Sequence, residues 1–387
     1  MKFISLIFLI SIIIVVYNYI GYAIIAYFLT QFKKYKITNY TSDYNPTVSF
    51  IIAAYNEENC IRQKIENSLQ QNYPKCLIEY IFITDGSTDN TNNIIHEYKE
   101  IKLLYEPERR GKSAALNRAV EEATHEIIIF SDANTLLNRD ATLNIVRHYN
   151  DLTIGGVAGE KKISKSSLKN EVEEGEGLYW KYESILKNID SNFHSVVGAA
   201  GELFSTKKSL YEPISANIIL DDFIISMKIA QRGYRIAYEP NAYASEFSSI
   251  SIKDEEKRKT RIAAGGFQAI YILKDLFLVW KNPKLSFLYI SHRVLRWTLS
   301  PLCIFLTYIT NLVLIINSLN YLYLYLFVLQ SIFYFFAICP FIIPGLNKYK
   351  IFKIPNYFLF MNISVLKGFI KFIKGNQSAT WEKVQRQ

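Results

Sequence analysis

Acidic and amide side chains recur in this sequence directly after short apolar runs. Glu57 follows a run that ends at Ala54, Asp85 follows the next run, and Asp132-Ala133-Asn134 follows a third. Carboxylate and amide oxygens accept hydrogen bonds and bind cations, so these groups could hold a ligand if they met in space. Each motif alone also fits a local role, because Asp85-Gly86 is typical of a turn and Asp132 of an Asx turn.

The apolar runs predict the elements that would bring these motifs together. Residues 48–54, 79–84 and 126–131 have the composition of buried strands, and residues 59–71 and 88–100 have helical patterns. Alternating strands and helices imply a mostly parallel sheet that is covered on both faces. In such sheets ligands bind at the carboxyl ends of the strands. The three motifs are therefore predicted to share one ligand-binding edge.

The composition indicates a membrane protein. The chain has 387 residues, of which 50% are apolar, with 10 prolines and 16 glycines, which excludes a disordered or collagen-like protein. Its net charge of +9 suits nucleic acid, an anionic substrate or an anionic membrane surface. Residues 3–32 and 297–347 carry no charge, and a spanning helix needs about 20 apolar residues. We predict one N-terminal span, two later spans joined by a turn at 317–320, and no nucleic-acid partner.

The charges that flank these segments predict the orientation. Lys33, Lys34 and Lys36 follow the first apolar segment, whereas only Lys2 precedes it. Basic residues favour the cytoplasmic side, so residues 33–296 are expected in the cytoplasm and the chain in the plasma (inner) membrane as a multi-pass protein. A cleaved signal peptide is the alternative for the first segment, but its apolar core exceeds the roughly 7–15 residues of such a signal.

Two other apolar stretches contain basic residues and are predicted to lie in the membrane plane. Residues 266–290 include Lys274 and Lys281, and residues 354–373 include Lys367. Amphipathic basic helices of this kind bind at the membrane interface, although a further span is the alternative for residues 354–373.

Six motifs lie in order along the central part of the chain. They are Ala53-Ala54-Tyr55-Asn56-Glu57, Asp85-Gly86-Ser87-Thr88-Asp89, Gly111-Lys112-Ser113-Ala114-Ala115-Leu116-Asn117, Asp132-Ala133-Asn134, Asp221-Asp222 and Arg258-Lys259-Thr260-Arg261. Together they resemble the signature blocks of family 2 glycosyltransferases, the membrane-bound relatives of cellulose, chitin, hyaluronan and poly-N-acetylglucosamine synthases. The resemblance covers residues 46–270 and implies an α/β, GT-A-like fold, with a mostly parallel sheet and helices on both faces, inserted between transmembrane helices.

The resemblance and the apolar segments together predict five regions. These are an N-terminal transmembrane helix (1–32), a cytoplasmic glycosyltransferase domain (33–250), interfacial helices with the basic arginine motif (251–296), two transmembrane helices (297–347), and an interfacial helix with a cytoplasmic tail (348–387).

The resemblance also implies how the donor is bound. Asp85, with Ala54 and Glu57 nearby, is expected to hold the nucleoside, because a carboxylate accepts hydrogen bonds from base and ribose groups. Lys112 is expected to contact the base or the diphosphate as a compact positive charge. Gly111-Lys112-Ser113 also resembles the end of an ATPase phosphate-binding loop, but Glu106 stands where that loop needs glycine.

The remaining acidic motifs are implied to act on the diphosphate and the acceptor. Asp132 and Asn134 are expected to bind Mg²⁺ or Mn²⁺; Asn134 stands where the family's Asp-x-Asp pattern has its second aspartate, and its amide oxygen can coordinate but brings no charge. Asp222 aligns with the catalytic base, and Asp221 is expected to raise its pKa by like-charge repulsion. A base that deprotonates the attacking hydroxyl implies one displacement and inversion. An acidic helix cap is the alternative interpretation of this pair.

The basic motif matches the Gln-x-x-Arg-Trp block of processive synthases in part. Arg261 occupies the arginine position and is expected to bind the diphosphate, while Arg258 replaces the glutamine and Ile262 the tryptophan. A basic amphipathic stretch on the membrane surface is the alternative. Loss of the tryptophan removes an aromatic platform for the acceptor sugar, which argues against a processive reaction.

These features predict an inverting, metal-dependent glycosyltransferase of polysaccharide synthesis. It would move a sugar from a nucleotide-sugar donor, with a UDP-sugar as the expected donor, to a growing glycan or lipid-linked acceptor at the cytoplasmic face of the membrane. It would act alone, as a homo-oligomer or with an export partner. The alternatives are a single-sugar transferase to a lipid carrier and a non-catalytic scaffold or export subunit that retains the donor fold.

Overall fold

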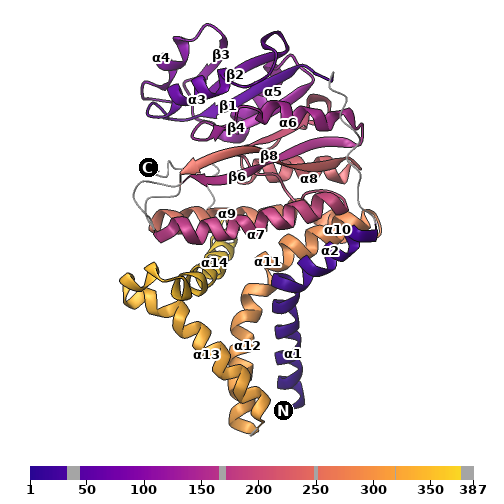
Figure 1. The fold of residues 1–387 in the computed structure, drawn as a ribbon, viewed down its shortest axis with the longest axis vertical. Helices are drawn as coiled ribbons and strands as arrows, with labels where there is room; N and C mark the ends of the chain where they lie inside the picture. Colours follow the sequence, from indigo (N-terminus) through magenta and orange to yellow (C-terminus); the bar gives the residue numbers. More distant parts are fainter. Residues whose placement is uncertain (33–43, 165–170, 248–251, 319, 376–387) are drawn as a thin grey trace.

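A computed structural model describes residues 1–32, 44–164, 171–247, 252–318 and 320–375. It has three levels, which Figure 1 shows from top to bottom: a sheet covered by helices, a layer of helices beneath it, and long helices that extend away from that layer. The described elements include all three strands that the sequence predicts.

An eight-stranded sheet forms the core of the upper level. Its order is β3-β2-β1-β4-β7-β6-β8-β5. The strands are β1 (Val48–Ala54), β2 (Ile78–Asp85), β3 (Ile101–Glu106), β4 (Ile127–Asp132), β5 (Leu136–Leu137), β6 (Ile154–Ser164), β7 (Phe204–Lys207) and β8 (Arg235–Phe247). β1 to β4 pair in parallel, as do β6 and β8, whereas β7 is antiparallel to both neighbours and β5 to β8. The predicted mostly parallel sheet is confirmed, and β7 makes it mixed.

Helices cover both faces of the sheet, as predicted. Side chains of β1 alternate between the faces, so that Phe50 and Ile52 pack with Ile61, while Ile51 packs with Leu116 on the other side. The first face carries α3 (Ile61–Leu69), α4 (Thr91–His96) and α6 (Ala141–Val146), and the second carries α5 (Lys112–Glu122) and α8 (Asp221–Gln231).

The helix predicted at residues 88–100 is shorter than expected. α4 begins at Thr91, because Asp89 Oδ1 accepts the Thr91 backbone N–H and holds the preceding residues in a turn. The chain turns again before β3 starts at Ile101. The local turn chemistry of Asp89 therefore determines where the helix starts.

A layer of helices lies beneath the sheet and connects it to the long apolar helices (Figure 1). It contains α7 (Glu171–Phe193), α9 (Ile252–Ile272), α10 (Pro283–Tyr289), α11 (Leu295–Trp297) and α14 (Lys350–Ile373). The carboxylate of Glu183 in α7 forms ion pairs with Arg293 and Arg296. This buried contact joins the layer's central helix to the segment that leads into α12.

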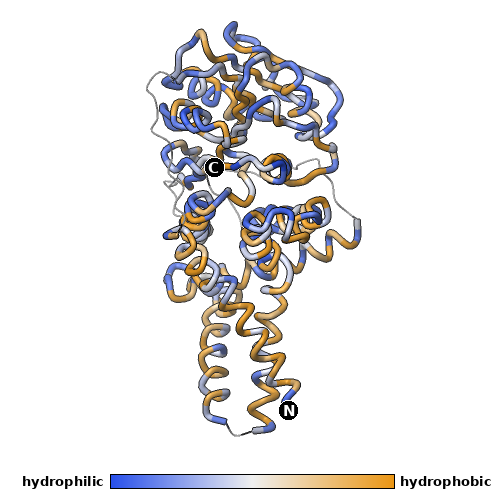
Figure 2. The backbone as a smooth tube through the Cα atoms, turned by 90° about the vertical axis from the view of Figure 1, so that its right-hand side faces the viewer, coloured by the Kyte–Doolittle hydropathy of each residue, from blue (hydrophilic) through white to orange (hydrophobic). Residues whose placement is uncertain are grey.

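Three helices among the described residues are long and apolar enough to cross a membrane. They are the continuous segment Lys2–Phe32 (α1, Lys2–Val16, and α2, Tyr22–Phe32), α12 (Leu299–Asn317) and α13 (Tyr321–Ile342). Figure 2 shows their strongly hydrophobic colouring where they extend from the layer. The predicted break at 317–320 coincides with the gap between α12 and α13.

α14 packs along α9. Lys367 of α14 pairs with Glu256 of α9, and Phe267 of α9 stacks against the rings of Phe369 and Phe372. Gly368 lets the two backbones approach, because a methyl group there would lie 2.5 Å from the Cβ of Ala263. α14 therefore belongs to the helix layer.

The close contact of α14 with α9 predicts that Gly368→Ala destabilises the protein. The added methyl group would also lie 2.9 Å from the backbone nitrogen of Ala264, so the helices must move apart. Overpacking of this kind costs about 1–3 kcal/mol. We expect a lower midpoint of thermal unfolding for the purified full-length protein. Gly177→Ala is the control, because a methyl group at this helical glycine meets nothing within 4 Å. Equal stability of the two variants would contradict the proposed packing.

Candidate active site

Asp85 positions the loop that leads into α5. Its side chain is 1% exposed, and its two carboxylate oxygens accept the backbone N–H groups of Arg110 at 2.9 Å and Gly111 at 2.7 Å. Gly111 has a φ of 94°, a conformation that favours glycine, and α5 begins at the next residue, Lys112. The end of β2 therefore fixes the position of Lys112. Contact of Asp85 with a nucleoside stays a prediction.

The other two residues predicted for the nucleoside lie at the same edge of the sheet. Ala54 is buried at the end of β1, and the Glu57 carboxylate lies 3.1 Å from the Cys60 thiol. Between them, the Tyr55 ring packs 3.8 Å from the Arg109 guanidinium. This arrangement brings β1 and the loop after β3 together beside Asp85, and leaves the predicted roles of Ala54 and Glu57 untested.

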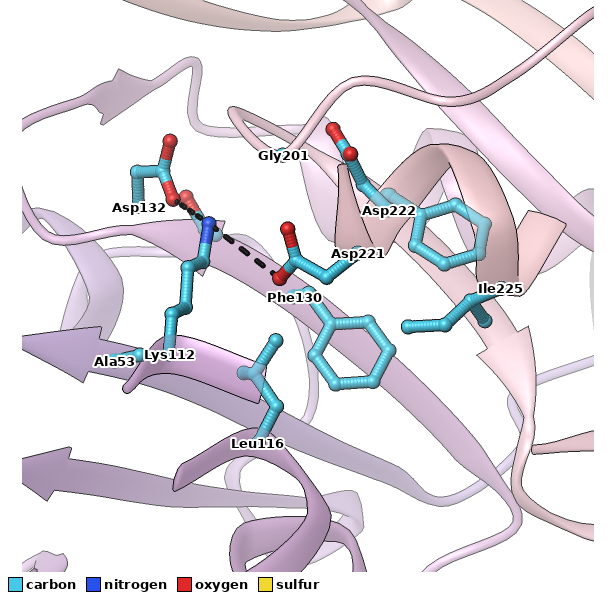
Figure 3. A pocket seen from close by; sticks show the side chains of 11 residues that line it. Ala53, Lys112, Leu116, Phe130, Asp132, Gly201, Asp221, Asp222 and Ile225 are labelled. Carbon is cyan, nitrogen blue, oxygen red and sulfur yellow. Dashed lines mark hydrogen bonds and ion pairs between the residues drawn. The ribbon is translucent and has the colours of Figure 1, made fainter. Parts of the chain in front are cut away.

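Charged groups from three elements converge at the centre of the edge (Figure 3). Lys112 Nζ of α5 lies 2.7 Å from Asp132 Oδ1 at the end of β4 and 3.9 Å from Asp221 Oδ2 at the start of α8. A methyl group on Gly201 would lie 3.1 Å from Lys112 Nζ, 3.4 Å from Asp222 Oδ2 and 3.6 Å from Asp132 Oδ1. Residues distant in the sequence thus surround one point, as the motifs predict.

Burial and neighbouring charges tune the ionisable groups here. Burial, and then the charge of Asp221, raise the pKa of Asp222 to about 7, although Lys112 opposes the shift. Burial lowers the pKa of Lys112, but Asp132 and Asp221 raise it by more, so it lies above its ordinary value. The lysine stays charged at neutral pH, while Asp222 can exchange a proton.

The donor set for a metal is small. The described ranges contain no group of three His, Cys, Asp or Glu side chains that could hold a metal ion together. Asp132 offers Oδ2, which bonds to no described residue, whereas its Oδ1 is bonded to Lys112. Asn134 lies on the turn after β4, outside the lining of the cavity described next. The residues fit a cation that a diphosphate also coordinates, with Asp132 as protein ligand.

A cavity of about 520 Å³ extends from these residues towards the helix layer. Asp132 and Asp222 line one end, Trp180 and Arg261 line its walls from α7 and α9, and Tyr357 lines it from α14. Its volume lies within the range of about 300–1,000 Å³ that is typical of ligand pockets. The candidate site therefore continues from the sheet edge into the helix layer.

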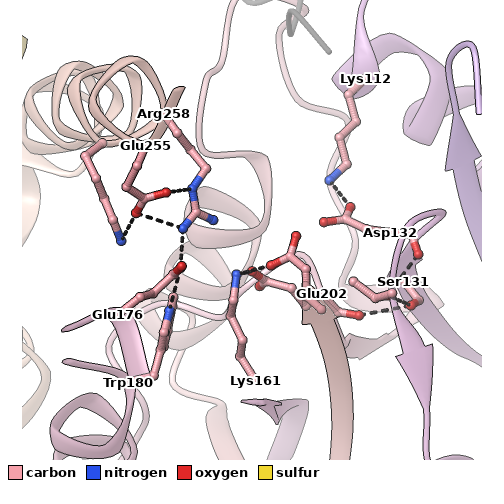
Figure 4. Close-up of polar contacts among 12 residues, drawn as sticks. Lys112, Ser131, Asp132, Lys161, Glu176, Trp180, Glu202, Glu255 and Arg258 are labelled. Carbon is pink, nitrogen blue, oxygen red and sulfur yellow. Dashed lines mark hydrogen bonds and ion pairs between the residues drawn. The ribbon is translucent and has the colours of Figure 1, made fainter. Parts of the chain in front are cut away.

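The two predicted arginines have different surroundings. Arg261 lines the cavity, and among the described residues no carboxylate forms an ion pair with it. Arg258 instead pairs with Glu176 of α7 and with Glu255, whose Oε2 lies 3.0 Å from its Nε (Figure 4). Burial lowers the pKa of Arg258, but these two carboxylates raise it well above its ordinary value. Arg258 thus joins α7 to α9, and Arg261 faces the cavity without a counter-ion.

Two buried lysines that support the site are absent from the sequence-based predictions. Lys161 of β6 pairs with Glu202 and Glu246, and Figure 4 shows its contact with Glu202 beside the site. Lys64 of α3 donates to Ser131 Oγ at 2.7 Å and to the Thr135 carbonyl at 2.9 Å, on either side of Asp132. Neither lysine belongs to a motif, so no signal in a single sequence distinguishes it from a surface lysine.

Comparisons with known proteins find glycosyltransferases among the relatives of this chain. A family model described as Glycosyl transferase family 2 matches residues 49–214. The chain is 32% identical over 301 residues to a poly-beta-1,6-N-acetyl-D-glucosamine synthase of Staphylococcus epidermidis, which covers 74% of this chain and 70% of that protein. A protein of the same name from Staphylococcus aureus (strain MSSA476) is 30% identical over 245 residues, 61% of this chain and 58% of that one.

A solved structure shares the fold over nearly the whole chain. It is the mannosyltransferase PcManGT from Pyrobaculum calidifontis in complex with GDP-Man and Mn²⁺, with a TM-score of 0.70 and 21% sequence identity. The match covers 95% of this chain and 99% of that one. It shows that the sheet, the helix layer and the long apolar helices form a known arrangement.

The hydrogen bonds of Lys64 predict that Lys64→Met destabilises the protein. The substitution leaves Ser131 Oγ and the Thr135 carbonyl without their buried donor, which costs about 1–3 kcal/mol. We expect a lower midpoint of thermal unfolding than for Lys99→Met, a control at an exposed lysine. An unchanged midpoint would show that Lys64 does not support the turn that carries Asp132.

Proposed function

Because the chain belongs to glycosyltransferase family 2, we propose that it transfers a sugar from a nucleotide-sugar donor to a glycan or lipid-linked acceptor, with inversion at the anomeric carbon. The observation that carries the proposal is the convergence of Lys112, Asp132 and Asp222 around Gly201, at the end of a cavity that contains Arg261.

The positive groups of the site suit a diphosphate. Lys112 and Arg261 line the same cavity, and both are cationic at neutral pH. Asp132 would hold Mg²⁺ or Mn²⁺, which supplies charge neutralisation for the leaving diphosphate when bound. Asp85, Ala54 and Glu57 would receive the nucleoside at the adjoining edge. The solved structure with the same fold contains GDP-Man and Mn²⁺, which supports this class of donor and cation.

The names of the curated relatives favour a particular sugar. They are synthases of a β-1,6-linked N-acetyl-D-glucosamine polymer. We therefore propose N-acetylglucosamine, delivered as its uridine diphosphate ester, and a product that is a polysaccharide. Donor and acceptor would meet at the cytoplasmic face of the plasma membrane, because the basic residues after the first apolar helix favour that orientation.

Asp222 is the proposed general base. Its Oδ2 lies 3.4 Å from the methyl position on Gly201, which is also 3.1 Å from Lys112 Nζ and 3.6 Å from Asp132 Oδ1. The anomeric carbon of the donor would sit beside this carboxylate, between acceptor and diphosphate. A base with a pKa near the working pH is deprotonated often enough to act and basic enough to accept the acceptor's proton. The hydroxyl would attack as Asp222 takes its proton, so that one displacement inverts the configuration. Asp221 would keep the pKa of Asp222 high.

The role of Asp222 predicts both the effect of Asp222→Asn and the pH dependence of transfer. The amide cannot accept a proton, so we expect a loss of kcat of about 10²-fold or more, with unchanged nucleotide affinity. Since Asp222 has a pKa of about 7 and is protonated below it, the wild-type rate should fall as the pH is lowered through 7. Radiolabelled sugar transfer in membranes and nucleotide binding by calorimetry measure these effects.

Asp275→Asn is the matched control, because Asp275 is exposed and lies outside the cavity. The midpoint of thermal unfolding of Asp222→Asn should not fall below that of the wild type, since the change removes a buried charge. Full transfer activity of Asp222→Asn would remove Asp222 from the mechanism.

The proposed ligand role of Asp132 predicts that Asp132→Ala weakens metal-dependent donor binding. We expect the Kd for UDP in the presence of Mn²⁺ to rise towards the value measured with a chelator, because the cation loses its protein ligand. Titration calorimetry with and without Mn²⁺ measures the change, with Asp275→Ala as control. If Mn²⁺ tightens UDP binding equally in the variant and the wild type, Asp132 is not the ligand.

A further inference from the structure

Lys187 of α7 is a buried cation that has no hydrogen-bond partner within the part of the chain that the structure describes. It is 2% exposed and lines the cavity, and its Nζ bonds to no atom of the described residues. Three carboxylates act on its charge, and each bonds elsewhere: Glu160 accepts from the hydroxyls of Ser184 and Tyr238, Glu202 pairs with Lys161, and Glu183 pairs with Arg296. Burial lowers the pKa of Lys187, the direction expected of an ammonium that has left water without gaining a partner.

A comparison with Lys64 shows why this absence is informative. Lys64 is equally buried, but its Nζ donates to Ser131 and Thr135. Buried polar groups are nearly always hydrogen-bonded, because leaving one unpaired costs folding free energy. A buried ammonium on the wall of a ligand cavity that has no partner among the described residues is therefore a donor whose acceptor is to come from the ligand.

The surroundings of Lys187 indicate the chemistry of that ligand. Its Nζ lies 5.5 Å from the centre of the Trp180 ring, and Trp180 also lines the cavity. The Tyr357 side chain of α14 also lines the cavity, and its hydroxyl likewise has no hydrogen-bond partner among the described residues. Donors beside an aromatic ring suit a ligand that has several oxygen acceptors and an apolar ring face, which is the chemistry of a pyranose sugar.

We infer that Lys187, with Trp180 and Tyr357, forms the subsite that binds the terminal sugar of the acceptor. The ammonium of Lys187 donates to a hydroxyl or acetamido oxygen of that sugar, and the indole of Trp180 lies against its ring. The subsite belongs to the cavity that contains Asp222, so a sugar held there presents a hydroxyl towards the base. Trp180 would then supply the aromatic platform that Ile262 cannot. The inference rests on the proposed transferase function.

The test compares Lys187→Met with Lys181→Met in the full-length protein. Lys181 lies on the same helix, is exposed and does not line the cavity. The probes are UDP-N-acetylglucosamine and a β-1,6-linked N-acetylglucosamine trisaccharide. For Lys187→Met we expect the KM for the trisaccharide to rise by about tenfold or more, the loss of one hydrogen bond from a charged donor. Donor hydrolysis without acceptor should stay within about twofold of wild type, since Lys187 does not contact the donor.

The midpoint of thermal unfolding separates a binding role of Lys187 from a structural one, because the two roles predict shifts of opposite sign. Replacing an unpaired buried ammonium by a similarly sized apolar side chain should raise the unfolding midpoint by about 2 °C or more. If Lys187 serves the fold, the midpoint should fall, as expected for Lys64→Met. A raised acceptor KM together with a raised midpoint supports the subsite, and a lowered midpoint overturns it.

The other outcomes are also decisive. If the wild type transfers sugar and Lys187→Met matches Lys181→Met in acceptor KM, the subsite is wrong while the transferase function stands. If the wild type neither hydrolyses nor transfers from any nucleotide sugar, the proposed function fails and the subsite with it. If Lys187→Met changes only the stimulation by phosphatidylglycerol vesicles, the ammonium binds a lipid headgroup and the sugar subsite is overturned.

A second variant covers the case in which Lys187→Met does not fold. Lys187→Gln retains an N–H donor without the charge, so its acceptor KM should lie above the wild-type value and donor hydrolysis should be retained. A wild-type acceptor KM in Lys187→Gln, in a protein that unfolds at or below the wild-type midpoint, would overturn the inference.

Discussion

The site depends on one buried cation held among carboxylates. Lys112 lies between Asp132 at the end of β4 and Asp221 at the start of α8, and without it these acidic groups would repel one another. Its position follows from the backbone, because Asp85 binds the two N–H groups that precede α5. A single lysine therefore couples the parallel half of the sheet to the helix that carries Asp222, and a ligand cation or diphosphate would enter this balance of charges.

Buried charges elsewhere fall into two groups with different consequences. Lys161 and Arg258 are paired with carboxylates that belong to other elements, so they connect β6 to β8 and α7 to α9. Such pairs keep the two elements in a fixed relative position, because separating them would leave a buried charge without its partner. Arg261 and Lys187 line the cavity without an ion pair among the residues that the structure describes. The first group builds the walls of the cavity, and the second is available to a ligand.

The helix layer makes the sheet and the apolar helices one unit. Asp190 of α7 accepts from Tyr22 in the N-terminal apolar helix and lies 2.6 Å from His292 Nδ1. Glu183, two helical turns earlier, binds Arg296 just before α12. The position of the cavity relative to the long apolar helices is thus set by buried polar contacts with little freedom to shift.

Much of the fold and the centre of the site follow from the sequence alone. Short apolar runs identify β1, β2 and β4, and long uncharged segments identify the apolar helices. Acidic motifs after the strands identify the edge where Asp85 and Asp132 lie. These are local patterns that one chain displays directly. The tertiary structure decided which charges remain unpaired. Arg258 has a local partner in Glu255, but its pairing with Glu176 of α7, and whether Arg261 or Lys187 has a partner, depend on residues many positions away. Local sequence holds no record of which side chains meet when distant helices pack.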